Sequence, residues 1–419
     1  MPKKSQSKPA YLRHKPTGQA RVRINGRDHY LGQYGSPASR ERYEELMAEW
    51  FARGGNVDAA LMTLDDLALR FMTHAESYYV KHGQQTSEIT CLRVAFRFLL
   101  DKHGTTRVRD FGPLALKQVR VQMIEERLTR KTINGMISRI RNVFKWGVSE
   151  QLVPIEVLQA LQSVDGLREG RTDAVESVPV RPVDVQVVER TIPHLARPVA
   201  AMVRLQLLTG ARPGEIVILR PCDLTRGTNG TWTYRPSTHK TEHHGRERRI
   251  FFGPEAQRVV RPFLDRDPES YCFSPTEAVA ELNAEKRRNR KSPMTPSQAA
   301  RKPVENPRRP AGDRYTQMTY RRAVCRACEI AFAMPGELRK APKDEDEEAK
   351  ETRRKEAADW RDRHVWHPNQ LRHTRATAIR AKFGIEAAQV VLGHSTTDMT
   401  EIYAERDFEK AAAVMKQIG

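Results

Sequence analysis

The sequence predicts a multidomain, mainly α-helical protein with a small three-stranded β-sheet plus a helix at the N-terminus, a central helical bundle and a C-terminal α+β domain. Three observations predict this fold class. Apolar and polar residues alternate in a short N-terminal stretch, apolar residues then recur at helical spacing for about a hundred residues, and β-type runs interrupt the helical pattern around residues 231–252. A chain of 419 residues can hold several domains, each with its own core.

Residues 10–52 are expected to form the first domain. Between Gln19 and Asn25 one face is apolar and the other basic: Ala20, Val22 and Ile24 against Arg21 and Arg23. This period-two pattern is typical of a half-buried strand, and Asn25-Gly26 is a strong hairpin signal. We therefore expect three short antiparallel strands, closed by a helix that begins near Pro37 and buries an apolar stripe.

Residues 62–165 are expected to form a helical bundle. The pattern predicts five helices, over residues 64–82, 87–103, 113–126, 130–151 and 154–162. Thr63 and Asp66 resemble a capping box at the first of them. The fourth helix combines an apolar face with basic side chains spread over the rest of its surface: Lys131, Arg139, Arg141 and Lys145. By itself this pattern predicts a basic helical bundle.

Residues 178–419 are expected to form the third domain. Arg212 lies between a helix ending at Gly210 and a second helix that Pro213 can start, with Glu215 placed to orient its guanidinium. Two short strands, within residues 231–234 and 248–252, should flank a turn that carries Lys240. Two segments, 283–314 and 337–363, lack an apolar pattern and are expected to be solvated insertions or a charged helix.

The net charge of +20 indicates a polyanionic partner, most commonly nucleic acid. No apolar run is long enough to span a membrane, and the N-terminal residues lack the apolar core of a signal peptide, so we expect a cytoplasmic protein with no membrane partner. Five cysteines are an odd, scattered set. Cys325 and Cys328 form a single C-x-x-C with no second pair nearby, so no metal site is expected.

The stretch WHPNQLRHTRATAIRAKFGIEAAQVVLGHSTTDMTEIYAE, residues 366–405, concentrates the chemistry. It places Arg372 and His373 near the start of one expected helix, His394 after a Leu-Gly at the end of the next, and Tyr403 nine residues later. A guanidinium, an imidazole and a phenol together supply charge stabilisation, a proton partner and an oxygen nucleophile. These are the groups needed to attack a phosphodiester.

This order of Arg-x-x-Glu, Lys, Leu-Arg-His, Leu-Gly-His and Tyr resembles the tyrosine recombinases, or phage-type integrases, whose genes are often carried by mobile elements. The resemblance covers the whole chain. It implies an arm-type DNA-binding domain at 10–52, a core-binding (SAM-like) domain at 62–165 and a catalytic domain at 178–419. It also implies DNA recombination and integration through a 3′-phosphotyrosine, with no cofactor.

The resemblance implies a role for each site residue. Those in the catalytic set are Arg212, Lys240, Arg372, His394 and Tyr403, supported by Glu215, Asn369 and His373. Those implied to contact DNA are Arg21, Arg23, Lys131, Arg139, Arg141 and Lys145. The implied partners are double-stranded DNA, further copies of the chain in a tetramer on paired sites, and an accessory DNA-bending protein.

One position departs from the family pattern. The family pattern is H-x-L-R-H, whereas Asn369 stands three residues before Arg372, and His367 lies two residues too early to replace the histidine. An amide can donate to a phosphate oxygen but cannot accept a proton as imidazole does. The group that takes the phenolic proton is left open. Two alternatives to a recombinase remain, a type IB topoisomerase-like enzyme and a catalytically impaired DNA-binding accessory factor.

Overall fold

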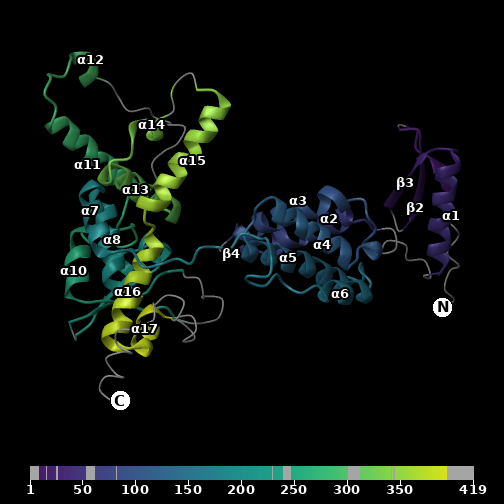
Figure 1. The fold of residues 1–419 in the computed structure, drawn as a ribbon, viewed down its shortest axis with the longest axis horizontal. Coiled ribbons are helices and arrows are strands. Elements are labelled where there is room, and N and C mark those ends of the chain that lie inside the picture. The colour runs from purple at the N-terminus through teal and green to yellow at the C-terminus, as the bar shows by residue number, and fades with distance from the viewer. Residues whose placement is uncertain are drawn as a thin grey trace. The chain divides into compact units, whose positions relative to one another are not determined.

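In the computed structural model the chain forms two compact units, Met1–Val178 and Pro179–Gly419. The structure describes residues 9–15, 17–24, 27–52, 62–81, 83–228, 230–238, 247–300, 312–340, 342 and 345–393. Figure 1 traces the elements along the chain. No helix in these described ranges is both long and apolar enough to cross a membrane. The mainly helical architecture with a small N-terminal sheet confirms the predicted fold class.

The N-terminal sheet has the predicted three antiparallel strands, in the order β1 (Tyr11–Arg13), β2 (Gln19–Ile24) and β3 (Arg27–Gln33). Helix α1 (Pro37–Ala52) follows and covers the sheet. Apolar side chains of β2, β3 and α1 form one buried cluster: Ala20, Val22, Ile24, Leu31, Leu46, Met47 and Trp50. The alternation in the sequence therefore marks the inner face of β2, as predicted.

The outer face of this sheet is less basic than the sequence suggests. Arg21 and Arg23 both pair with Asp28 of β3, at 2.9 Å from Nη1 and 3.1 Å from Nε. The Arg23 side chain stays 62% exposed, whereas that of Arg21 is 26% exposed. Because one carboxylate serves both guanidinium groups, part of their charge is neutralised within the sheet.

The first unit continues as a helical bundle. Its helices are α2 (Leu64–Tyr78), α3 (Ser87–His103), α4 (Pro113–Glu125), α5 (Arg130–Ser149) and α6 (Ile155–Gln162). The capping box is present, since the Asp66 N–H donates to Thr63 Oγ1 and the Thr63 N–H donates to the Asp66 carboxylate, both at 3.2 Å. Helix α2 ends four residues earlier than predicted because β4 (Val80–Lys81) pairs with β5 (Gln84–Gln85) around a left-handed Gly83.

The second unit builds its core around α8 (Arg197–Thr209), which packs against α10 (Pro254–Val260) and α16 (Pro368–Phe383). Helix α7 (Val185–Thr191) precedes α8, and a 3₁₀ turn at Ile192–His194 separates them, because Pro193 lacks the backbone N–H that would continue the helix. The sheet contains the two expected strands, β7 (Trp232–Tyr234) and β8 (Ile250–Phe252). It has a third, β6 (Leu224–Arg226), that the sequence analysis did not predict.

The predicted insertions contain helices. Helix α11 (Pro275–Arg288) extends into the first of them, so the first six residues of that insertion, 283–288, are the exposed and charged end of a helix. A short helix, α12 (Pro296–Ala299), follows within that insertion. Helix α13 (Gln317–Ala331) separates the two insertions, and α14 (Gly336–Arg339) comes next.

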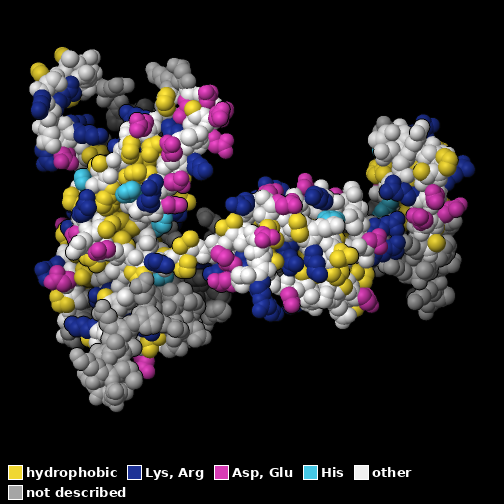
Figure 2. Space-filling model, viewed as in Figure 1, with side chains coloured by type: hydrophobic (Ala, Val, Ile, Leu, Met, Phe, Trp, Pro, Cys, Tyr) yellow, Lys and Arg dark blue, Asp and Glu magenta, His cyan; other side chains and the backbone are white. Residues whose placement is uncertain are grey.

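The second insertion is largely a charged helix, α15 (Glu347–His364), which buries only Ala357. Figures 1 and 2 show α15 extending from the core of the unit with acidic and basic side chains intermixed. It is tied back to α13 by an ion pair of 2.8 Å between Arg361 Nε and Glu329 Oε1. Its surface therefore has no continuous charge of one sign.

Candidate active site

Arg212 and Glu215 lie at the junction of α8 and a one-turn helix, α9 (Pro213–Ile216). Gly210 ends α8 in the left-handed conformation, with φ of 66°, and Pro213 starts α9. Glu215 accepts the Arg212 backbone N–H at 2.8 Å and its Nη1 at 2.9 Å. The Glu215 side chain is buried, whereas that of Arg212 is 21% exposed. The buried carboxylate of Glu215 thus holds the Arg212 guanidinium in a position where it is partly exposed at the surface.

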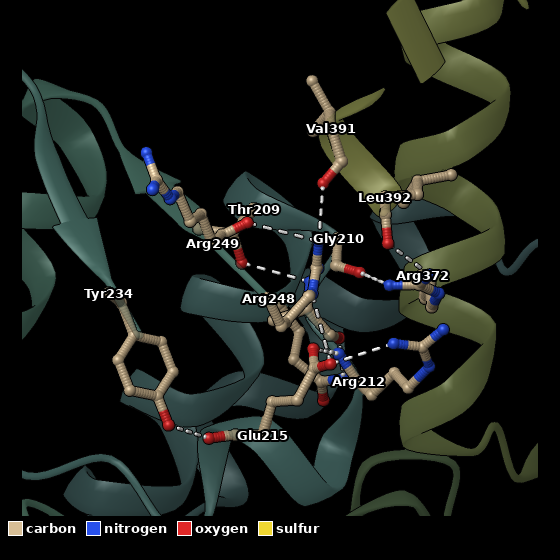
Figure 3. A network of polar contacts seen from close by, with 12 residues as sticks. Thr209, Gly210, Arg212, Glu215, Tyr234, Arg248, Arg249, Arg372, Val391 and Leu392 are labelled. Carbon is tan, nitrogen blue, oxygen red and sulfur yellow. Dashed lines mark hydrogen bonds and ion pairs between the residues drawn. The ribbon is translucent and has the colours of Figure 1, made fainter. Parts of the chain in front are cut away.

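Arg372 of α16 is fully buried beside this pair. Its Nη1 donates to the Gly210 carbonyl at 2.7 Å, and its Nη2 donates to the Leu392 carbonyl at 2.8 Å. These carbonyls lie at the C-terminal ends of α8 and of α17 (Ile385–Leu392), where helices leave acceptors without intrahelical donors. Arg372 therefore holds two helix ends together (Figure 3).

Arg248 is a third guanidinium of the site, which the sequence analysis did not single out. Its Nε lies 3.3 Å from Glu215 Oε1, and its Nη1 lies 3.3 Å from the Val391 carbonyl (Figure 3). The sequence contained a signal for it. Arg248 precedes Ile250 and Phe252 at steps of two, and both of those side chains are buried, so strand periodicity places Arg248 on the inner face.

The combined charge of the four side chains described above, three guanidinium groups and one carboxylate, favours the binding of an anion. Burial alone would raise the pKa of Glu215. The charges of Arg248, Arg212 and Arg372, with the Arg212 backbone N–H, instead hold that pKa below its ordinary value. Burial also lowers the pKa of Arg248. Three guanidinium groups against one carboxylate leave two positive charges in excess, and the single negative charge of a phosphodiester can offset one of them.

The remaining residues of the predicted set divide into two groups. Lys240, His394 and Tyr403 lie outside the described residues. Asn369 is half-buried in the first turn of α16, and His373 is buried next to Arg372. Chain connectivity still links the first group to the cluster, since Arg248 follows Lys240 by eight residues and Gly393 directly precedes His394.

His367 is the residue before α16 and contacts α13. Its backbone N–H donates to Gln370 Oε1 at 2.8 Å, and its Nε2 lies 3.3 Å from Arg321 Nη2. Burial, followed by the charge of Arg321, lowers the pKa of His367. The imidazole is therefore neutral near pH 7.

The basic residues of α5 have unequal surroundings. Arg139 forms a two-pronged ion pair with Glu88 of α3, at 2.6 and 2.8 Å, which raises its pKa. Arg141 donates to the Val164 carbonyl at 3.3 Å. Lys131 and Lys145 are exposed. Two of these four residues, Arg139 and Arg141, thus bond within the bundle, because tertiary neighbours supply acceptors that the helix pattern does not reveal.

The cysteine pair lies in α13, where Cys328 is buried and Cys325 half-buried. Burial raises the pKa of both thiols. Across the described residues, no group of three or more His, Cys, Asp or Glu side chains is arranged to hold a metal ion.

Comparison with known proteins identifies the fold. No protein-family model and no curated protein matches the chain. Solved structures do, and they show that the chain has the tyrosine recombinase fold. An integrase of the Tn1549 transposon, in complex with circular intermediate DNA, aligns with 84% of this chain and 99% of its own, at 18% identity and a TM-score of 0.52. A lambda integrase dimer bound to a COC′ core site aligns with 97% and 96%, at 14% identity and a TM-score of 0.51.

Proposed function

We propose that this protein is a site-specific DNA recombinase, an integrase that cuts and rejoins DNA through a 3′-phosphotyrosine intermediate. The observation that carries the proposal is the cluster of Arg212, Arg372 and Arg248 around Glu215, two positive charges in excess at the ends of α8 and α17. The chain leads from this cluster directly to the segments that carry Lys240, His394 and Tyr403. The tyrosine recombinase fold of solved integrase–DNA complexes supports the same conclusion.

In the proposed reaction the Tyr403 oxygen attacks the scissile phosphorus. As the phenol gives up its proton to a base or to water, a bond forms between its oxygen and phosphorus. The bond from phosphorus to the 5′ oxygen breaks, and Lys240 gives that 5′ oxygen a proton. Arg212, Arg372 and His394 stabilise the charge of the pentacoordinate phosphorane. Asn369 donates to a phosphate oxygen, and His373 supports Arg372. The phosphotyrosine retains the energy of the broken bond, so no cofactor is required.

The direct test is a covalent adduct assay on a nicked suicide substrate, in which the released strand diffuses away. A protein–DNA adduct that survives denaturation is expected with the full chain. Absence of an adduct on any core-length duplex would favour the impaired accessory factor. Relaxation of a supercoiled plasmid without paired sites would instead favour the type IB topoisomerase-like enzyme, since a recombinase needs two sites.

Lys240 is predicted to be the acid that protonates the leaving oxygen. Lys240→Ala should slow cleavage of normal DNA but cleave a substrate with a 5′-bridging phosphorothiolate at nearly the wild-type rate, because a thiolate leaves without a proton. Single-turnover cleavage of the two substrates measures this difference. If the sulfur substrate restores nothing, Lys240 is not the acid.

Asn369 is predicted to bond a phosphate oxygen in the transition state. Asn369→Ala should then slow cleavage by about 5- to 150-fold, which corresponds to roughly 1 to 3 kcal/mol for a lost hydrogen bond. Asn369→His tests whether the family histidine adds activity through its ability to accept a proton. An unchanged cleavage rate in the alanine variant would show that Asn369 does not stabilise the transition state.

The two parts of the first unit are proposed to bind DNA, the sheet of residues 10–52 at arm-type sites and the bundle of 62–165 at the core site. Removing residues 1–55 should leave cleavage of a short core site unaffected while weakening binding to longer attachment DNA. The full chain should show the steeper dependence of affinity on salt, since each phosphate contact releases counterions. Because Asp28 offsets Arg21 and Arg23, the difference should be modest. Equal slopes would contradict the arm-site assignment.

Homo-oligomers on paired sites, with an accessory DNA-bending protein, complete the proposal. A recombinase exchanges strands between two duplexes, so each product requires several protomers held together. Gel shifts with one and two sites should show a paired complex of higher order only when two sites are present.

A further inference from the structure

Arg248 connects two parts of the candidate site that are far apart in sequence. Only 6% of the residue is exposed. Its Nε faces Glu215 Oε1, which also accepts Arg212 Nη1, while its Nη1 donates toward the Val391 carbonyl near the end of α17. Figure 3 shows the Arg248 side chain between the Arg212–Glu215 pair and the end of α17. One side chain thus contacts the orienting carboxylate and the helix that leads to Gly393.

Packing alone does not account for an arginine at this place. Its Nη2 is buried and makes no hydrogen bond within the described part of the chain. A buried donor left unpaired costs free energy, and so does a buried charge. Ile250 and Phe252, on the same strand face, fill their space without either cost. The hydrogen bonds and the charge of Arg248, rather than its packing, therefore explain better why an arginine stands at this position.

The turn after α17 closes directly on the Arg248 guanidinium. Gly393 ends the helix with φ of 66°, a left-handed conformation that favours glycine. A Cβ added at residue 393 would lie 2.4 Å from Arg248 Nη1 and 3.2 Å from its Cζ. The turn has no room for a larger residue while the guanidinium is in place.

We propose that Arg248 is a positioning residue for phosphodiester cleavage, which fixes the turn at Gly393 against the Arg212–Glu215 pair. Gly393 directly precedes His394 in the chain, so a fixed turn sets the point from which the following segment begins. Arg248 also fills part of the hydrogen-bonding capacity of Glu215, so that the carboxylate holds Arg212 in one orientation. This inference rests on the proposed recombinase function.

The test compares two neighbouring arginines in the full-length chain. Arg248→Met keeps the length of the side chain and removes its charge, and Arg249→Met makes the same change at a side chain that is 52% exposed and pairs with Glu247. Arg248→Met should slow adduct formation about tenfold to a hundredfold, the scale for misplaced catalytic groups, with DNA affinity unchanged. Arg249→Met should cleave at the wild-type rate. Arg248→Lys should recover part of the loss.

The pH profile separates positioning from general structural damage. Glu215 is surrounded by Arg212 of the α9 junction, Arg248 before β8, Arg372 of α16 and the Tyr234 hydroxyl of β7, which donates to its backbone carbonyl. Without Arg248 the pKa of Glu215 rises, so the carboxylate that holds Arg212 is lost at a higher pH. The acid limb of the cleavage rate should therefore shift to higher pH in Arg248→Met and stay in place in Arg249→Met.

A second measurement does not depend on activity. Gly393→Ala should lower the melting temperature of the full-length protein more when Arg248 is present than in the Arg248→Ala background, because only the first case adds a collision to the backbone strain. Equal losses in both backgrounds would overturn the proposed contact. A wild-type cleavage rate in Arg248→Met, or an equal loss in Arg249→Met, would overturn the positioning role. If the wild-type protein forms no adduct but this coupling is present, the proposed function fails while the contact stands.

Discussion

Replacing Tyr403 with phenylalanine is expected to abolish the covalent protein–DNA adduct while leaving DNA affinity unchanged. Only the phenolic oxygen is removed, and in the proposed mechanism that oxygen forms the bond to phosphorus. The ring remains to fill the same space. The measurement is denaturing electrophoresis of the protein with a labelled suicide substrate, beside a gel shift of the same DNA.

Tyr271→Phe is a matched control in the second unit. Tyr271 is a half-buried tyrosine that packs beneath Arg314, so the same loss of an oxygen there should leave adduct formation at the wild-type level. An adduct formed by the Tyr403→Phe protein at an appreciable rate would identify another nucleophile.

Arg212→Ala and Arg372→Ala are each expected to slow cleavage by about a hundredfold or more. This is the scale for removing one preorganised donor to a developing anion. The two variants should differ in stability. Arg372 is fully buried and serves the carbonyls of Gly210 and Leu392, and each buried carbonyl left without a donor costs about 1 to 3 kcal/mol of unfolding free energy. Arg212 is partly exposed, so its loss should destabilise the protein less.

Thermal unfolding and single-turnover cleavage, measured on the same preparations, separate the two effects. Arg258→Ala is a suitable control because that side chain is 70% exposed and pairs with Glu255, three residues earlier on the same helix. Cleavage by Arg212→Ala within a factor of a few of wild type would contradict the role assigned to the Arg212–Glu215 pair.

Local patterns in the sequence determined much of the architecture. Period-two alternation identified the inner face of β2, because a strand turns successive side chains to opposite faces. Helical spacing and caps identified the bundle helices, and the Pro-Gly-Glu turn after Arg212 placed a guanidinium at a helix junction. Each of these rests on residues within a few positions of one another, which is the range over which backbone geometry acts.

The chemistry of the site followed from residue types in order along the chain. That order predicted Arg212, Glu215 and Arg372, and the structure brings these three together around the ends of α8 and α17. Lys240, His394 and Tyr403 lie outside the described residues, so their roles stay predictions.

Only the tertiary structure decided which basic side chains pair with acceptors within the protein. Glu88 forms an ion pair with Arg139, and Asp28 forms ion pairs with Arg21 and Arg23. Glu215 pairs with Arg248, which lies 33 residues away in the sequence. A charge pattern counts side chains on a surface but does not show which distant acceptor comes within hydrogen-bonding distance. The sequence thus determined the helices and strands and the catalytic chemistry that their residues suggest. Packing determined the burial and the partners of each guanidinium, because both depend on groups that folding brings together.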